Sequence, residues 1–125
     1  MALPSSINWS HIDTTKLDPD FYAKAQGVLN ACLAHGCEYE PYLGFRSWDE
    51  QNALYQRYLA GGPRASPPGH SLHEKGLAVD CERIVDGQGS WATEDYSMLE
   101  AQAQVYGMDT GWSYGDYDHL SVNGK

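Results

Sequence analysis

The chain has 125 residues, of which 42% are hydrophobic and 12% aromatic, so it is too apolar for a disordered protein and of the right length for one domain, residues 1–125. The 8 Lys+Arg against 17 Asp+Glu give a net charge of −9, which argues against nucleic acid and against an anionic membrane as partners. The sequence contains no run of 18 apolar residues and no signal-peptide pattern, so we expect synthesis in the cytoplasm without a signal peptide. We also expect a monomer.

The first third of the chain predicts an irregular start, a helix and a strand. Residues 1–16 show no periodic pattern and form the irregular lead-in. Asp18 and Pro19 predict a helix start, because Asp caps helices and Pro fits the first helical position, and an apolar stripe at helical spacing follows. Residues 38–45 alternate loosely, which indicates a strand that Pro41 breaks or bulges.

The middle of the chain predicts a helix, a loop and a strand. Ser47 and Glu50 have the spacing of a capping box, so a second helix is predicted to start at Trp48. Residues 61–70 are rich in Gly and Pro and predict a loop. Residues 76–85 alternate in the way that is typical of a strand.

The last third predicts a turn at residues 86–89 and a third helix that starts near Thr93 and ends at Gly107. Residues 110–122 contain strand-forming residues that are split by Gly115. Few parallel crossovers of standard length fit this order of elements. We therefore expect an α+β fold, with helices packed against a small, mostly antiparallel sheet.

The cysteines carry little information. Cys32, Cys37 and Cys81 are odd in number, so they cannot form a closed set of disulfides, and we expect three reduced, mostly buried thiols. Cys81 is the one serious candidate for a zinc ligand by its position, although it is expected to face the core.

The polar residues that say most about function are two histidines and two aspartates. Asp80 is predicted on a half-buried strand, where an ionised carboxylate is costly unless a metal or an Arg pairs with it. With His73 and His119 it would bind a tetrahedral ion and leave one position open for water. Asp116 is then placed to accept a proton, provided that the chain bends near Gly115. The alternative is that both histidines are ordinary surface or capping residues.

The pattern Ser71-x-His73-x2-Gly76-x-Ala78-x-Asp80 with a later Asp116-x2-His119 resembles the signature of the M15 zinc peptidases. This family includes D-Ala-D-Ala carboxypeptidases, D-Ala-D-Ala dipeptidases and the L-alanyl-D-glutamate endopeptidases of phage lysins. The segment 44–55, with Arg46 and Ser47, is similar to a further stretch of the family. The resemblance implies a fold like that of the Hedgehog domains and DD-peptidases.

The resemblance also implies roles for individual residues. His73, Asp80 and His119 would bind Zn²⁺, and Asp116 would act as the general base. Arg46 would stabilise the scissile carbonyl as charge develops on it. The alternative for Arg46 is a structural ion pair with a carboxylate of the following helix.

Substrate-binding residues are less well marked. Ser71 is expected to bind substrate or to cap its loop, and Trp112 and Tyr114 are expected to line the site. A carboxypeptidase needs a cation for the terminal carboxylate of its substrate, and nothing in the sequence singles out one of three candidates, Arg64, Lys75 and Arg83.

The predicted function is a zinc-dependent peptidoglycan hydrolase that cleaves stem peptides. The favoured activity is that of an L-alanyl-D-glutamate endopeptidase of the phage or prophage endolysin type. Such an enzyme would act on the cell wall after release or delivery. One alternative is a D-alanyl-D-alanine carboxypeptidase or dipeptidase. The other is a non-catalytic, zinc-stabilised binding domain of the same fold, against which Arg46 and Asp116 both argue.

Overall fold

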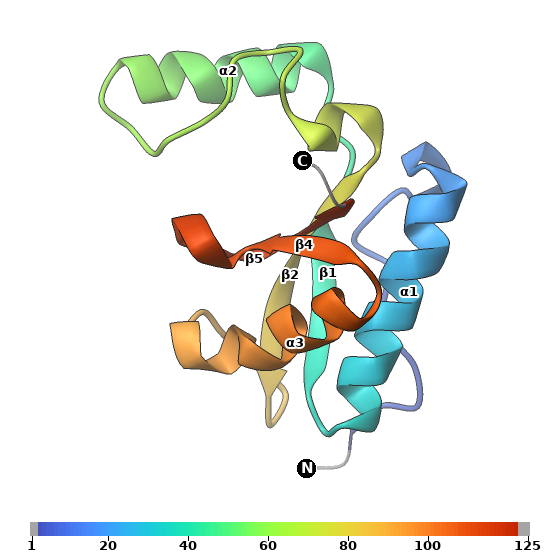
Figure 1. The fold of residues 1–125 in the computed structure, drawn as a ribbon. Helices are drawn as coiled ribbons and strands as arrows, with labels where there is room; N and C mark the ends of the chain where they lie inside the picture. Colours follow the sequence, from blue (N-terminus) through green and yellow to red (C-terminus); the bar gives the residue numbers. More distant parts are fainter. Residues whose placement is uncertain (1–2, 123–125) are drawn as a thin grey trace.

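A computed structural model describes residues 3–122, and for Tyr114 it describes the backbone alone. Its centre is an antiparallel sheet in the order β1-β2-β5-β4, with β3 paired to β2 (Figure 1). The strands are β1 (Glu38–Leu43), β2 (Ala78–Val85), β3 (Gln88–Ser90), β4 (Met108–Gly111) and β5 (Asp116–Val122). Helices pack against this sheet, so the predicted α+β fold is confirmed.

The helices divide into a packed pair and an isolated one. α1 (Pro19–Ala34) and α3 (Ser97–Val105) pack against each other, and they contact β1 and β4 respectively. α2 (Trp48–Leu59) lies apart from both (Figure 1), and its one buried residue is Gln51. Short 3-10 helices complete the chain: η1 (Thr14–Lys16), η2 (Leu72–Lys75), η3 (Thr93–Tyr96) and η4 (Trp112–Tyr114). None of the described helices combines the length and apolar character needed to cross a membrane.

The helix starts follow from local capping, as predicted. The Asp18 side chain accepts a hydrogen bond from the Phe21 amide at the start of α1. Ser47 and Glu50 form both hydrogen bonds of a capping box at the start of α2. Because these bonds are made within a few residues, the sequence pattern alone was sufficient to locate both helix starts.

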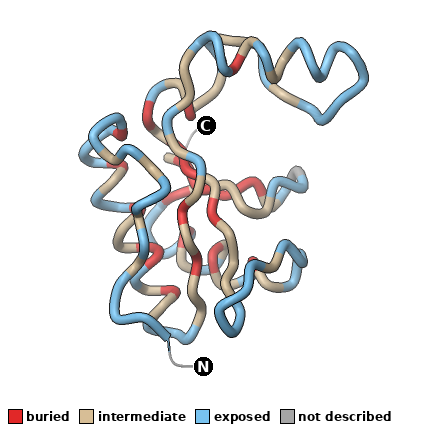
Figure 2. The backbone as a smooth tube through the Cα atoms, turned by 180° about the vertical axis from the view of Figure 1, so that it is seen from behind, coloured by how far each residue is buried: buried red, intermediate tan, exposed pale blue. Residues whose placement is uncertain are grey.

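The hydrophobic core lies between the packed helices and the sheet. Figure 2 shows the buried residues gathered along the central strands, whereas the arm that contains α2 is mostly exposed or half-buried. Val79 and Cys81 of β2 and Leu120 of β5 belong to the core. Since side chains alternate along a strand, Asp80 and His119 project from the opposite face of the sheet. One face therefore builds the core and the other presents polar side chains.

The cysteines follow the prediction. All three are free, and Cys32 and Cys81 are fully buried. Burial raises the pKa of the Cys81 thiol well above its ordinary value, and the nearby Asp80 carboxylate raises it further. Cys81 lies in the core and belongs to neither group of described side chains that could hold a metal ion, so it is not a ligand candidate.

The structure corrects the predicted turn at residues 86–89. The turn consists of Asp86 and Gly87 alone, both with positive φ (51° and 79°), which is the backbone of a tight two-residue hairpin. Gln88 and Gly89 consequently pair with β2 as part of β3. The Asp-Gly pair is itself the sequence signal for this hairpin.

Two further boundaries differ from the prediction. The third helix begins as the 3-10 helix η3, and α-helical geometry starts only at Ser97. Residues 3–16, the described part of the lead-in, are irregular apart from η1, but Ile7, Trp9 and Ile12 pack against the core. The predicted bulge in β1 is confirmed, because the register with β2 shifts between Pro41 and Leu43.

Gly76 tests the close packing of the end of η2 against the backbone at Lys16. Its φ is +69°, and a Cβ there would lie 2.5 Å from the Lys16 carbonyl oxygen. We expect Gly76→Ala to cost about 1–3 kcal/mol for this clash in addition to about 1 kcal/mol for the left-handed backbone. Urea unfolding measures the loss.

Gly36→Ala is the matched control, because Gly36 also has a positive φ of 88° but open space around its Cβ position. It should cost only the backbone term of about 1 kcal/mol. Equal losses for the two variants would contradict the close approach at Gly76.

Candidate active site

His73 is held by the short helix η2 on the polar side of the sheet. Ser71 and Glu74 cap η2 with reciprocal hydrogen bonds, and Gly76 ends it in a left-handed conformation. The backbone amide of Arg46 donates to the His73 carbonyl, at 3.1 Å between nitrogen and oxygen. These bonds fix the backbone around a histidine that is only 4% exposed.

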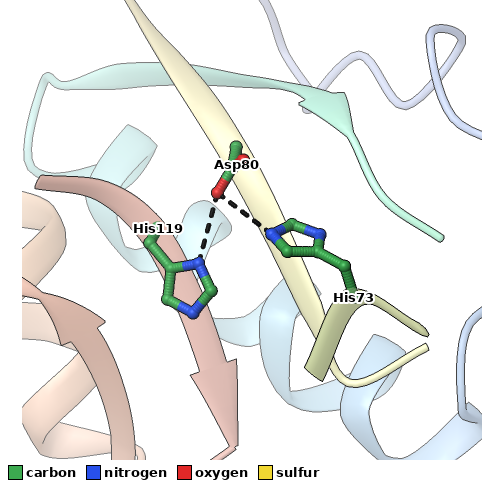
Figure 3. Close-up of side chains that lie close together, drawn as sticks. All are labelled: His73, Asp80 and His119. Carbon is green, nitrogen blue, oxygen red and sulfur yellow. Dashed lines mark hydrogen bonds and ion pairs between the residues drawn. The ribbon is translucent and has the colours of Figure 1, made fainter. Parts of the chain in front are cut away.

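Asp80 and His119 are brought together by sheet register. They are direct partners on the antiparallel strands β2 and β5, so their side chains project from the same face. Figure 3 shows the imidazoles of His73 and His119 directed at the Asp80 carboxylate. The Asp80 Oδ1 atom lies 3.4 Å from His73 Nε2 and 3.3 Å from His119 Nδ1.

The tautomer of His73 suggests that a cation belongs between these groups. Its Nδ1 lies 2.8 Å from the Gly44 carbonyl oxygen, which can only accept a hydrogen bond, so Nδ1 carries the proton. In the neutral ring, Nε2 is then a lone pair that faces the Asp80 carboxylate. Two such acceptors are favourable neighbours when a cation is shared between them. A backbone carbonyl on the second nitrogen is the usual support of a metal-binding histidine.

The electrostatics of the cluster favour an ionised Asp80. Burial raises the pKa of Asp80, but the neighbouring imidazoles of His119 and His73 outweigh burial and leave this pKa well below its ordinary value. For His119, burial lowers the pKa, and the Asp80, Asp116 and Asp118 carboxylates outweigh burial and raise it. The cluster therefore stabilises positive charge at its centre.

The donor set suits zinc by chemistry and by spacing. His73, Asp80 and His119 each offer one ligand atom, and these atoms lie within 4.8 Å of one another. Donors at zinc bond lengths of about 2.0–2.2 Å on a tetrahedral ion are about 3.3–3.6 Å apart. The two measured separations from Asp80 Oδ1, 3.3 and 3.4 Å, fall in this range. Two nitrogen ligands and one carboxylate leave a fourth position open.

Asp116 lies beside this cluster without being one of its three donors. Its Oδ2 is 3.8 Å from His119 Nδ1, and its side chain is half exposed. The bend that the sequence analysis required is present, because Gly115 has a φ of +83°. In addition, the β4–β5 register shifts so that Gly111 pairs with Asp116. A Cβ at Gly111 would overlap Asp116, so this close approach requires glycine.

Asp118 forms a second acidic position close to Asp80 and Asp116. Tyr42 donates a hydrogen bond of 2.9 Å to Asp118 Oδ2. Burial, together with the neighbouring Asp116 and Asp80 carboxylates, raises the pKa of Asp118 to about 7. A carboxyl group that is partly protonated near neutral pH thus lies next to Asp116.

Arg46 is anchored by a glutamine of the following helix, and not by a carboxylate as in the alternative that the sequence analysis left open. Its guanidinium donates to Gln51 Oε1 at 2.8 Å, and Gln51 Nε2 donates to the Ser66 carbonyl at the same distance. Gln51 is only 2% exposed. It therefore ties the arginine to the 61–70 loop, a role that its place in the segment 44–55 had not revealed.

These groups line one cleft of about 380 Å³. Arg46, Ser71 and Asp116 border it together with the three zinc-ligand candidates. Ser71 also accepts a hydrogen bond from the His73 amide, so the loop-capping role is present. The structure does not bring Trp112 to the cleft, since its ring packs edge-on against Tyr117. The Tyr114 side chain lies outside the described part of the structure.

The structure shows which of the three candidate cations for a substrate carboxylate lie at the cleft. Arg64 lines the cleft and Lys75 does not. Arg83 donates to the carbonyls of Glu38 and Ile84 near the β2–β3 turn, away from the cleft. Arg57, which the sequence analysis did not consider, lines the cleft as well.

Comparison with protein families identifies the chain. The family model described as VanY, D-alanyl-D-alanine carboxypeptidase, matches residues 14–123. The chain belongs to the VanY family. The predicted resemblance to the M15 peptidases is thereby confirmed, and the matched region contains every residue of the cleft described above. No curated protein sequence matches the chain.

Solved structures of VanY-like fold include three informative neighbours. The L-Ala D-Glu endopeptidase ChiX of Serratia marcescens has a TM-score of 0.70 at 18% identity, over 89% of this chain and 84% of that one. The LD-carboxypeptidase LdcB has a TM-score of 0.63 at 27% identity, over 90% and 70%. A vancomycin-resistance D,D-pentapeptidase VanY solved in complex with Zn(II) has a TM-score of 0.64 at 23% identity, over 86% and 73%.

Zinc binding is testable without any assay of activity. We expect one Zn²⁺ per chain by metal analysis, and saturating Zn²⁺ should raise the melting temperature of the metal-free protein by about 5–10 °C. His73→Ala removes one of the three candidate donors and should abolish both effects.

His70→Ala is the matched control, because His70 lines the same cleft but is not part of the donor group. This variant should bind zinc as the wild type does. Stoichiometric zinc in His73→Ala would remove His73 from the site.

Proposed function

We propose that the protein is a zinc-dependent peptidase that cleaves peptidoglycan stem peptides. The observation that carries this proposal is the convergence of His73, Asp80 and His119 on one point of a cleft that also contains Asp116 and Arg46. Membership of the VanY family and the peptidoglycan-directed activities named for its neighbours support the choice of substrate.

In this mechanism His73, Asp80 and His119 would hold the ion. Bound zinc supplies a Lewis acid that lowers the pKa of water and polarises a carbonyl group. Asp116 accepts a proton from the attacking water and returns it to the leaving amine, for which its exposed position beside His119 is suited. Arg46, held by Gln51, donates to the carbonyl oxygen as negative charge develops. No covalent enzyme intermediate is required.

For the bond that is cut, we propose L-Ala–D-Glu, in line with the resemblance to endopeptidases of phage lysins. The description of the matched family favours the second candidate, removal of a terminal D-Ala from D-Ala–D-Ala. A non-catalytic binding domain is the least favoured alternative, because such a domain has no need of an acid and an arginine that border the same cleft.

Digestion of defined stem peptides distinguishes these candidates. We expect the zinc-loaded protein to release fragments cut between L-Ala and D-Glu, detected by mass spectrometry. Dialysis against a chelator should abolish the cleavage, and added Zn²⁺ should restore it. Release of D-Ala alone would support the carboxypeptidase, and no cleavage of either bond would contradict the proposed peptidase.

Asp116→Asn tests the general base separately from the metal. The substitution removes the proton acceptor but keeps the shape of the side chain, so kcat should fall by about 10²–10⁴-fold. Zinc content should remain at one per chain, since Asp116 is not among the three donors. Unchanged kcat in the zinc-loaded variant would show that another group takes the proton.

A further inference from the structure

Most of the arginines of this acidic protein line the cleft. The chain carries a net charge of −9, yet three of its four arginines, Arg46, Arg57 and Arg64, line the cleft. Arg46 is hydrogen-bonded to Gln51 and has a role in the proposed mechanism. Arg57 and Arg64 have no role there. Within residues 3–122, no hydrogen bond or ion pair of either guanidinium group to another residue is found.

A tight turn joins the two segments that carry these arginines. Arg57 lies in the last turn of α2, and Arg64 follows two glycines and a proline. Gly61 has a φ of +100°, and the Gly62 amide donates to the Arg57 carbonyl at 2.8 Å. The chain therefore reverses directly after α2 and returns along the cleft. Arg57 precedes this reversal in the sequence and Arg64 follows it.

Unpaired arginines in a substrate cleft predict an anionic group on the substrate, because guanidinium binds carboxylate with strong, directional hydrogen bonds. Both candidate substrates offer the same group. In D-Ala–D-Ala, the residue after the cut bond carries the terminal α-carboxylate. In L-Ala–D-Glu, the stem peptide continues through the side-chain carboxyl of D-Glu, so the α-carboxylate of D-Glu is free. This is the charged group that the two substrates share next to the cut bond.

We propose that Arg57 and Arg64 bind the free α-carboxylate of the residue that follows the scissile bond. This inference rests on the proposed peptidase function, but not on which of the two bonds is cut. It assigns substrate selection to the end of α2 and its turn, which line the same cleft as the residues of β2 and β5 that carry the chemistry. Both arginines are exposed, so water competes for the carboxylate and limits the gain in binding.

The test compares matched peptides that differ in one group. The first arm uses a stem peptide with L-Ala–D-Glu and the same peptide with the D-Glu α-carboxylate converted to a carboxamide. The second arm uses a peptide ending in D-Ala–D-Ala and its terminal carboxamide. In the arm that the enzyme cleaves, wild type should prefer the carboxylate by about tenfold in kcat/KM. The arm with activity identifies the source of the carboxylate.

The variants are Arg57→Ala, Arg64→Ala and the double variant. The double variant should lose the preference and cleave carboxylate and carboxamide peptides at similar kcat/KM. The carboxamide should be cleaved as by wild type, which shows that folding and zinc binding are intact. Lys24→Ala is the matched control, since it removes one positive charge from α1, outside the residues that line the cleft. It should keep the full preference.

Two outcomes would overturn the inference. Equal cleavage of carboxylate and carboxamide by wild type, or an undiminished preference in the double variant, contradicts carboxylate binding by Arg57 and Arg64 while the peptidase function stands. Cleavage of none of the four peptides by zinc-loaded wild type contradicts the proposed function, and the inference fails with it.

Discussion

The register between β2 and β5 is the constraint on which the rest of the site depends. It places Asp80 directly opposite His119 on the polar face of the sheet, while Val79 and Leu120 point into the core. A shift of one residue in either strand would turn a ligand candidate into the core and a core residue into the cleft. The packing of the core and the geometry of the proposed metal site are therefore specified by the same hydrogen-bonded pairing.

The second layer of the site is built from loops whose positions are fixed by backbone hydrogen bonds. His73 receives its orientation from the Gly44 carbonyl, and the Arg46 amide binds the His73 carbonyl in return. The segment after β1 and the helix η2 thus hold each other next to the sheet. Asp80 Oδ1 lies 3.4 Å from His73 Nε2 and 3.3 Å from His119 Nδ1, so these candidate donors already lie close together.

α2 stands out because it contributes little to the core yet forms a wall of the cleft. Its one buried residue, Gln51, is a polar side chain that connects Arg46 to the Ser66 carbonyl. The outer end of the helix carries Arg57, and the turn that follows carries Arg64. An element with few apolar contacts can vary its exposed side chains at small cost in stability, which suits a wall that selects the substrate.

The sequence by itself determined the features that are decided locally. Capping by Asp18 and by Ser47 with Glu50 located two helix starts, alternation in residues 76–85 located the central strand, and the histidine and aspartate motifs indicated the family. It also overlooked one local signal, the Asp86-Gly87 hairpin.

Only the tertiary structure decided which distant side chains meet. It brought Gln51 to Arg46 and Tyr42 to Asp118, excluded Arg83 from the cleft, and turned Trp112 toward Tyr117. These outcomes depend on strand register, on a shifted β4–β5 pairing and on the path of the 61–70 loop. Long-range pairing sets such contacts, and no periodicity within a short window of sequence encodes them.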